Sequence, residues 1–154
     1  MKKKIIILFF CMTILLAQFL NAEERFLSLK NNKVNVRYGP GKENAIKYVY
    51  NKKNFPVKLI DKKEHWRRII DFKNNSGWIH RSQLKSSNSI IVLEDKILFK
   101  KASSFSKPLA RLQKGRLLII KKCDQGWCKV TTDIYSGWVK IDNTWGLLNK
   151  ISNQ

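Results

Sequence analysis

The sequence predicts an all-β fold built from two copies of one small unit. After residue 23, apolar residues come in short runs rich in β-branched and aromatic residues, separated by turn signals such as "GPG", "KNNSG" and "DQG". Many short strands at close spacing are typical of a small β-sandwich or barrel. The phrase "SGW" followed by a β-branched residue occurs twice, at 76–79 and 136–139. A chain of 154 residues is long enough for two very small domains.

The two halves align over a longer stretch, with residues 55–80 lying against residues 115–140. Each copy contains a β arm, a tight turn, a Trp with an apolar residue three positions later, and the Gly-Trp phrase. The matched residues are Trp66 with Trp127, Ile69 with Val130, and Gly77-Trp78 with Gly137-Trp138. Self-similarity with a period of about sixty residues implies two copies of one structural unit.

The order of these segments predicts the domain boundaries. We expect a leader at residues 1–22, a first unit at 24–93, a second and more divergent unit at 94–148, and a tail at 149–154. The phrase "RSQL" indicates a short helical turn, "SIIVLE" the last strand of the first unit, and "KILF" the first strand of the second. No linker rich in Pro or Gly separates the units. We therefore expect them to dock rigidly, with "SIIVLE" at or near the contact.

The first 22 residues are typical of a secretory signal peptide. Three lysines precede an apolar run, and Ala22 marks the expected cleavage site, although Leu20 stands where a smaller residue is usual. An uncleaved anchor is the alternative, but the run falls short of the roughly 20 residues that a spanning helix needs. A lipidated Cys11 is disfavoured because "LFFC" lacks the expected small residues. We therefore expect an exported protein of the periplasm or cell envelope.

The chain is strongly basic. Loss of the three leader lysines lowers the net charge from +20 to +17. Such an excess attracts polyanions and permits weak contact with anionic surfaces. The lysines are spread along the chain, however, and only "WRR" is a local cluster. Nucleic acid is not expected as a partner of an exported chain.

Two cysteines follow the leader, Cys123 and Cys128, on either side of a turn-like Asp-Gln-Gly. Taken as the two arms of a hairpin, the flanking residues bring the thiols together if both lie on the same face. An exported chain matures where disulfides persist. A disulfide would close a short loop and add about 2 kcal/mol. Two free thiols or a metal pair are the alternatives, and only His65 and His80 could complete a metal site.

Several phrases resemble the bacterial SH3-like domain: "VNVRYGPG", "WRRIIDF" and "SGWIHRSQL". With "GWC" and "TWGL" in the second copy, the chain is similar to the exported double SH3-like proteins of proteobacteria over about residues 26–148. The resemblance implies two half-open β-barrels of about five strands each. It also implies a non-catalytic module that binds cell wall (peptidoglycan) or an envelope protein. The second copy departs from the pattern, because "ILFKKASS" stands where the first has "VNVRYGPG".

The repeated Gly-Trp phrase has a structural explanation. Gly77 and Gly137 are expected to supply a positive φ or a bulge as the chain enters a bent strand. Trp78 and Trp138 would then be large plates in small cores, with a ligand platform as the alternative. Trp145, in the terminal Trp-Gly phrase, is also expected to be structural.

Other aromatic and basic residues are candidates for a ligand groove. Trp66 and Trp127 have opposite parity to the apolar residues three positions later, so their rings should face outward or sideways. The candidate groove residues are Arg37, Tyr38, Tyr48, Tyr50, Trp66, Arg67 and Trp127. SH3-type folds recognise extended ligands in aromatic-lined grooves. A structural turn with solvated arginines is the alternative.

The sequence does not predict an enzyme. His80 and Cys128 are the only nucleophile–base pair worth considering, and a crosslink explains Cys128 better. No metal cluster, nucleophile elbow or cofactor motif is present, and "GPG" lacks the features of a phosphate loop. The alternative to wall binding is a structural or scaffold role through protein–protein interaction in the periplasm, without glycan contact. The sequence does not predict the oligomeric state.

Overall fold

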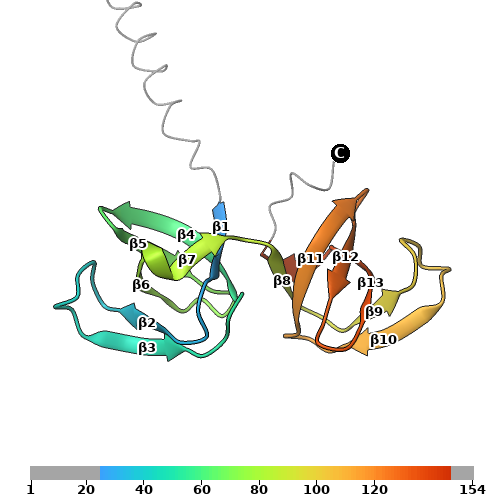
Figure 1. The fold of residues 1–154 in the computed structure, drawn as a ribbon, viewed down its shortest axis with the longest axis horizontal. Helices are drawn as coiled ribbons and strands as arrows, with labels where there is room; N and C mark the ends of the chain where they lie inside the picture. The colour runs from blue at the N-terminus through green and yellow to red at the C-terminus, as the bar shows by residue number, and fades with distance from the viewer. Residues whose placement is uncertain (1–24, 147–154) are drawn as a thin grey trace, which may run out of the picture.

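The structure, a computed structural model, describes residues 25–146. It contains two seven-stranded antiparallel sheets, each curled into a small barrel, and the barrels lie side by side (Figure 1). The expected all-β class is therefore confirmed. The expected leader at residues 1–22 and tail at 149–154 lie outside the described residues, as does the last part of the second unit.

The first unit contains β1 (Arg25–Leu29), β2 (Val34–Arg37), β3 (Ile46–Tyr50), β4 (Pro56–Lys63), β5 (Trp66–Ile70), β6 (Ser76–His80), the 3-10 helix η2 (Arg81–Gln83) and β7 (Leu84–Ser86). Its strand order is β3-β2-β6-β5-β4-β1-β7. The helical turn expected in "RSQL" is η2.

The second unit contains β8 (Ser89–Val92), β9 (Lys96–Phe99), β10 (Pro108–Leu112), β11 (Leu117–Asp124), β12 (Trp127–Thr131), β13 (Ser136–Lys140) and β14 (Thr144–Trp145). Its strand order is β10-β9-β13-β12-β11-β8-β14, which repeats the first unit strand for strand. The predicted internal repeat is therefore confirmed.

Strand β8 belongs to the second unit, whereas the sequence predicts it in the first. The segment "SIIVLE" was predicted to close the first unit, but β8 pairs with β11 and β14 of the second sheet. All four residues of β8 are buried, so the strand shows no alternation that would favour one neighbour over another. The change of sheet occurs at residues 87–88, between β7 and β8.

Tight hairpins join the longest strand pairs. Glu64 between β4 and β5 has φ 47°, and Gln125 and Gly126 between β11 and β12 have φ 44° and 79°. Left-handed residues at the tip match the right-handed twist of the flanking strands. The two hairpins are equivalent: β4 and β5 end with the pair Lys63–Trp66, and β11 and β12 with Asp124–Trp127.

Each barrel has its own apolar core. The buried residues of the first core are Leu27, Leu29, Val34, Val36, Val57, Ile69 and Ile79. Those of the second are Ile90, Val92, Leu98, Leu112, Leu118, Cys128, Val130 and Val139. Buried positions alternate with more exposed ones in β2, β6, β12 and β13, as expected for sheets with one buried face.

Gly77 and Gly137 are required for a different reason than the one predicted. Neither of these two glycines has a positive φ. Instead, a Cβ at Gly77 would overlap Val36 Cγ1 and lie 3.0 Å from the Arg37 carbonyl oxygen. A Cβ at Gly137 would lie 2.7 Å from the Phe99 carbonyl oxygen. A neighbouring strand, β2 or β9, thus crosses too closely for any side chain.

The prediction that Trp78 and Trp138 are core plates is wrong. Gly77 and Ile79 point inward and are buried, so Trp78 between them lies on the outer face of β6 and is half-buried. Trp138 has the same position in β13, and the Lys122 ammonium lies 5.4 Å from its ring centroid. Neither ring belongs to the buried core clusters of the two barrels.

The disulfide between Cys123 and Cys128 is present. The two residues face each other directly across β11 and β12, one pair before the hairpin tip. Cys128 is fully buried and Cys123 packs against the same core. The crosslink therefore closes one end of the second barrel.

The two barrels meet at a seam that contains Phe26, Ser28, Asn54 and Pro56 of the first unit and Ser89, Trp145 and Gly146 of the second. The Ser28 and Ser89 hydroxyl oxygens lie 2.8 Å apart, and the Ser89 hydroxyl also donates to the Asn54 carbonyl oxygen. Ser28 and Ser89 are fully buried. Buried hydroxyls that satisfy one another fix the relative position of the elements that hold them.

Trp145 adds a second contact at the seam. Its indole Nε1–H donates to the Pro56 carbonyl oxygen at 3.2 Å, and its ring meets Phe26 edge-on with 5.1 Å between centroids. The end of the second unit is thus attached to the first. The expected structural role of Trp145 and the expected contact at "SIIVLE" both agree with this arrangement.

Candidate functional site

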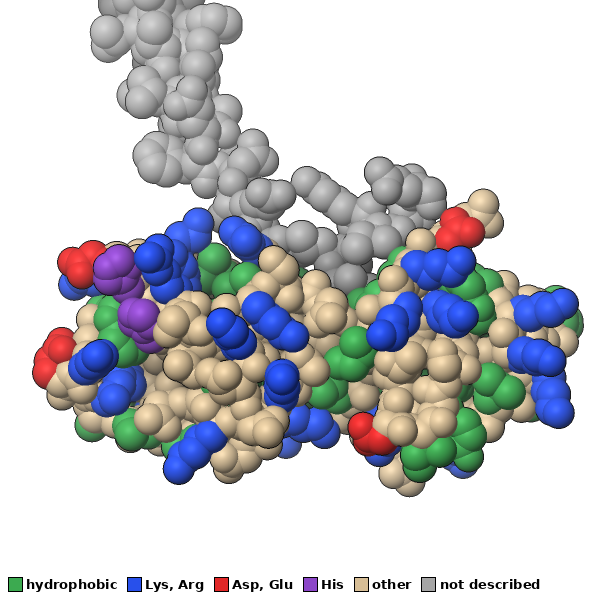
Figure 2. Space-filling model, viewed as in Figure 1, with side chains coloured by type: hydrophobic (Ala, Val, Ile, Leu, Met, Phe, Trp, Pro, Cys, Tyr) green, Lys and Arg blue, Asp and Glu red, His purple; other side chains and the backbone are tan. Residues whose placement is uncertain are grey.

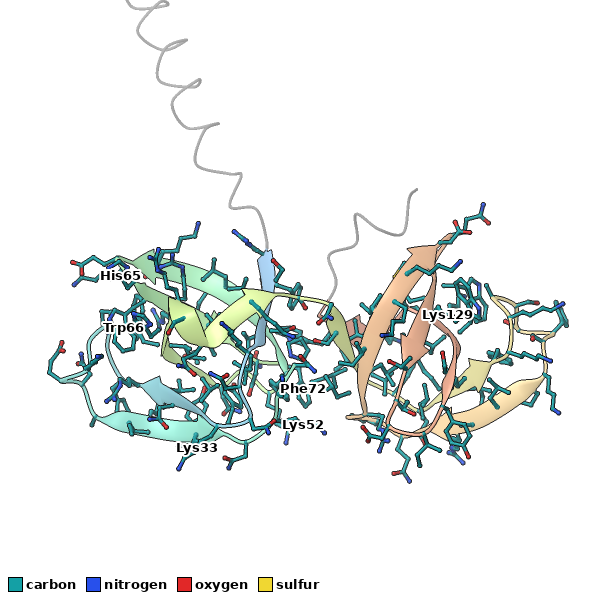
Figure 3. The ribbon with its side chains drawn as sticks, in the orientation of Figure 1. Lys33, Lys52, His65, Trp66, Phe72 and Lys129 are labelled. Atoms are coloured by element: carbon teal, nitrogen blue, oxygen red, sulfur yellow. A yellow bond between two sulfur atoms is a disulfide. The ribbon has the colours of Figure 1, made fainter. Side chains whose placement is uncertain are left out.

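A hollow of about 540 Å³ lies on the outer face of the first barrel, beside η2. Asn35 and Arg37 of β2, Trp66 of β5 and His80 of β6 form its base. Lys33, Lys42, Ser82 and Gln83 complete its walls. We call this hollow the Trp66 groove. It lies at the end of the first unit that is farthest from the second, as the position of Trp66 in Figure 3 shows.

Strand pairing brings the aromatic residues of the groove together. Trp66 and His80 are directly opposed across β5 and β6, and their rings meet edge-on with 5.4 Å between centroids. His65, at the hairpin end, lies 6.0 Å from His80 by the same measure. The two histidines of the chain therefore stand beside one Trp, and they form the adjacent purple side chains in Figure 2.

The start of η2 orients the His80 ring. Its Nδ1 accepts a hydrogen bond from the Ser82 backbone N–H and lies 2.7 Å from the Ser82 hydroxyl oxygen. These two contacts on Nδ1 fix the orientation of the imidazole ring. His80 thus serves both as the cap of η2 and as a polar edge of the groove.

The loop after β2 forms the far wall. The Arg37 guanidinium donates to the Asn44 carbonyl oxygen, and the Tyr38 amide donates to the Ala45 carbonyl oxygen at 3.2 Å. Gly41 is buried in this loop, where a side chain would meet Glu43. The Arg-Tyr-Gly-Pro-Gly phrase therefore folds into a compact loop that holds Arg37 at the groove.

The Trp66 groove is positively charged. Lys33, Arg37 and Lys42 line it, and no carboxylate does so among the described residues. Lysine and arginine side chains are spread over the visible surface of both barrels (Figure 2). On the opposite wall, the Asn31 amide donates to the Gln83 amide oxygen at 2.7 Å. An aromatic plate surrounded by cations and neutral donors fits an elongated ligand that carries carboxylates.

Three of the predicted groove residues lie elsewhere. Tyr38 is exposed in the loop, with the Lys47 ammonium 5.7 Å from its ring centroid. Tyr48 and Tyr50 share one face of β3, as expected, but their rings pack against the first core. None of the three lines the Trp66 groove.

Tyr50 instead belongs to a structural network. Its hydroxyl donates to the buried Asp71 carboxylate at 2.9 Å, and burial raises the pKa of the phenol. The same carboxylate accepts hydrogen bonds from the Lys73 and Asn75 amides, both at 2.9 Å. Asp71 thus holds the turn between β5 and β6 and anchors Tyr50 beneath it.

Arg67 also lies outside the groove. Adjacent residues of a strand point to opposite faces, so Trp66 faces the groove while Arg67 faces the other side of the hairpin. The Arg67 guanidinium donates to the Glu64 and Trp66 carbonyl oxygens at 2.9 and 2.8 Å. Of the seven predicted residues, only Arg37 and Trp66 meet at one site.

The equivalent surface of the second unit has a phenylalanine in place of the arginine. Phe99 occupies the position of Arg37, since each pairs with the Trp of the Gly-Trp phrase, Trp138 or Trp78. The Phe99 ring meets Trp127 edge-on with 5.8 Å between centroids. The ring of Trp127 is half-buried like that of Trp66, and it therefore meets a phenylalanine where the first unit has an arginine.

Sequence reasoning missed most of the polar lining: Lys33, Asn35, Lys42, His80, Ser82 and Gln83. Only His80 could have been found from the sequence, because pairing of the two strands in a hairpin places it directly opposite Trp66. The others come from a loop and from η2, whose positions depend on the closed barrel rather than on any local pattern.

The described residues contain no group of three or more His, Cys, Asp or Glu side chains that could hold a metal ion. Within residues 25–146 there is likewise no helix with the length and apolar character needed to span a membrane.

Comparison with protein families identifies the repeat. The family model "Bacterial SH3 domain" matches twice, at residues 30–86 and 96–146, and together the matches cover more than half of the chain. The chain belongs to the bacterial SH3 domain family. It carries two such domains in tandem, as the repeated strand order requires.

Two solved structures from Trichomonas vaginalis are similar to the chain. NlpC2 is 11% identical with a TM-score of 0.39, and the match covers 83% of this chain and 50% of that one. NlpC1 is 11% identical with a TM-score of 0.37, covering 80% and 46%. The chain thus spans about half the length of these proteins. None of the curated proteins matches the sequence.

Proposed function

We propose that the protein is an exported, non-catalytic binding module that uses the Trp66 groove to bind the cell wall. One observation carries the proposal: in the first SH3 domain, Trp66 and His80 form an aromatic surface that is open and surrounded by cations without a lining carboxylate. Peptide stems of the wall are extended and carry carboxylates, which suits such a groove. Export follows from the signal-like leader in the sequence.

The difference between the two domains supports a single binding site. The second domain keeps the fold and the Trp but places Phe99 against its ring. The first domain has Arg37 at the position of Phe99, and Arg37 and Trp66 line the groove together. Because the fold accepts either residue, the cationic lining of the groove is not a requirement of stability.

Sedimentation with purified sacculi tests the proposal. Trp66→Ala should weaken binding about tenfold or more, because a buried aromatic anchor typically contributes over 1 kcal/mol. Trp127→Ala is the matched control, since it removes the equivalent ring from the domain that has Phe99 in place of Arg37, and it should retain binding. Thermal melts of both variants exclude unfolding as the cause.

Two results would contradict the proposal. Equal binding by the parent and Trp66→Ala, with complete loss in moderate salt, would show generic electrostatic attraction. Wall hydrolysis in a gel assay would contradict a non-catalytic role.

An alternative is a scaffold role through one protein partner. It is favoured by the exposed apolar side chains of the second domain: Phe105 is fully exposed on the loop between β9 and β10, and Ile134 is 78% exposed. In-cell crosslinking that returns one dominant protein, and loses it with Phe105→Ser, would support this alternative over wall binding.

A further inference from the structure

A second hollow lies on the first barrel, on the side of the β4–β5 hairpin that faces away from the Trp66 groove. Its floor contains Leu27, Leu59 and Leu84, which belong to or pack against the first core. Its rim carries five cationic side chains: Arg25, Lys62, Arg67, Arg81 and Lys85. We call these five residues with their apolar floor the basic mouth. Its volume is about 230 Å³.

Within residues 25–146 the rim charges have no acidic counterparts. No carboxylate of this range lines the basic mouth, and none of its five cations forms an ion pair with a described residue. Arg67 is held in place by the Glu64 and Trp66 carbonyl oxygens. Arg25 and Arg81 are exposed on either side of it. Like charges gathered on one rim repel one another, and a bound anion would relieve this repulsion.

The second domain shows that the fold does not need these charges. The register places Cys123 and Cys128 where the first domain has Lys62 and Arg67. Ile141 follows β13 as Arg81 follows β6, and it packs on the second core.

The other two rim positions also lose their charge. Trp145 pairs with Ile91 of β8, and Lys85 pairs with Ser28 at the equivalent place in β1. The amide of Ile120, which is equivalent to Leu59, donates to the carbonyl oxygen of Asn88, so Asn88 takes the place of Arg25. The equivalent positions of the second domain therefore hold a disulfide, Ile141, Trp145 and Asn88, with no charge, whereas those of the first domain hold five cations.

We propose that the basic mouth binds a phosphate group. Three arginines offer planar donor forks that match phosphate oxygens, and phosphate can carry more charge than a single carboxylate. The apolar floor suits the uncharged part of a molecule that bears the phosphate. This site is separate from the Trp66 groove, because Trp66 and Arg67 point to opposite faces of β5.

Vesicle sedimentation with the purified protein tests this inference. The probes are phosphatidylcholine vesicles doped with phosphatidylglycerol, vesicles of equal surface charge doped with oleate, and soluble pyrophosphate as competitor. The variant is Lys62→Gln with Arg81→Gln, two exposed side chains whose loss leaves the Arg67 hydrogen bonds intact. The matched control is Lys129→Gln with Lys140→Gln, two exposed positions of the second domain.

The variant should bind phosphatidylglycerol vesicles about 25-fold more weakly than the parent, because each cation near an anionic lipid surface contributes about fivefold. The control and Trp66→Ala should bind as the parent does. Competition by pyrophosphate would identify a free phosphate as sufficient, whereas binding to vesicles without competition would identify the lipid headgroup. An equal loss in the control, or equal binding to oleate vesicles, would overturn the inference.

Discussion

Gly77 offers a direct test of why the Gly-Trp phrase recurs. A methyl group at this position would overlap Val36 Cγ1, and the Arg37 carbonyl oxygen would lie 3.0 Å away. Val36 is fully buried, so it cannot move into solvent. An ordinary contact needs 3.4–4 Å, and β2 would therefore have to move away from β6 by about 1 Å, which disturbs the sheet and the wall of the groove.

Overpacking of this kind costs about 1–3 kcal/mol. The upper end applies to Gly77→Ala because both a buried side chain and a backbone oxygen are affected. A loss of about 3 kcal/mol should lower the melting temperature by roughly 10 °C or more in a protein of this size. Thermal unfolding followed by circular dichroism measures the change, with Ser76→Ala on the same strand as control.

A second substitution makes the reasoning sharper. Val36→Ala removes the overlapping methyl, so Gly77→Ala should cost less in that background than in the parent, and the double-mutant cycle should show coupling. No such relief is available for Gly137, because its closest contact is the Phe99 carbonyl oxygen at 2.7 Å. If Gly77→Ala melts like Ser76→Ala, or if the cycle shows no coupling, close approach does not explain the glycine.

Three further outcomes are expected. Trp145→Phe removes a hydrogen bond across the seam and should lower the free energy of unfolding by about 1 kcal/mol, measured by urea titration. Reduction of the Cys123–Cys128 disulfide should lower it by about 2 kcal/mol, measured by melting with and without reductant. Because burial raises the pKa of Tyr50, the native state keeps a proton that the unfolded chain releases, so stability should fall as the pH rises above about 10. Tyr50→Phe should weaken that decline in urea titrations across the alkaline range, although it also removes a hydrogen bond to Asp71.

The repeat could be predicted from the sequence because its signals are local. Trp66 and Trp127 occupy the same place after their hairpin turns, and the aligned halves give the same strand order. The disulfide followed from the same hairpin geometry, since Cys123 and Cys128 stand at equal distance from the tip. Domain boundaries were harder, because β8 is apolar on both faces and could serve either sheet.

The candidate site was predicted only in part. Arg37 and Trp66 are distant in sequence and meet because β2 and β5 both pair with β6. Period two already excluded Arg67 from the face of Trp66, but clustering in "WRR" suggested otherwise. The position of Trp78 was also determined by parity, since Gly77 and Ile79 take the inward positions, yet the size of the ring favoured the core. The role of the glycines depends on a crossing strand that no local pattern reveals.

The seam determines where a fusion partner or a surface tether can be placed on the molecule. Gly146 accepts a hydrogen bond from the Ser87 hydroxyl, and Arg25 directly precedes Phe26, so both ends of the described chain lie near the middle of the molecule (Figure 1). A reporter protein or sensor-chip tether at either end would stand away from Trp66 at the outer end of the first barrel (Figure 3). An attachment before Arg25 would crowd the five cations, however. Attachment after Gly146 leaves Trp66 accessible and gives every copy the same orientation.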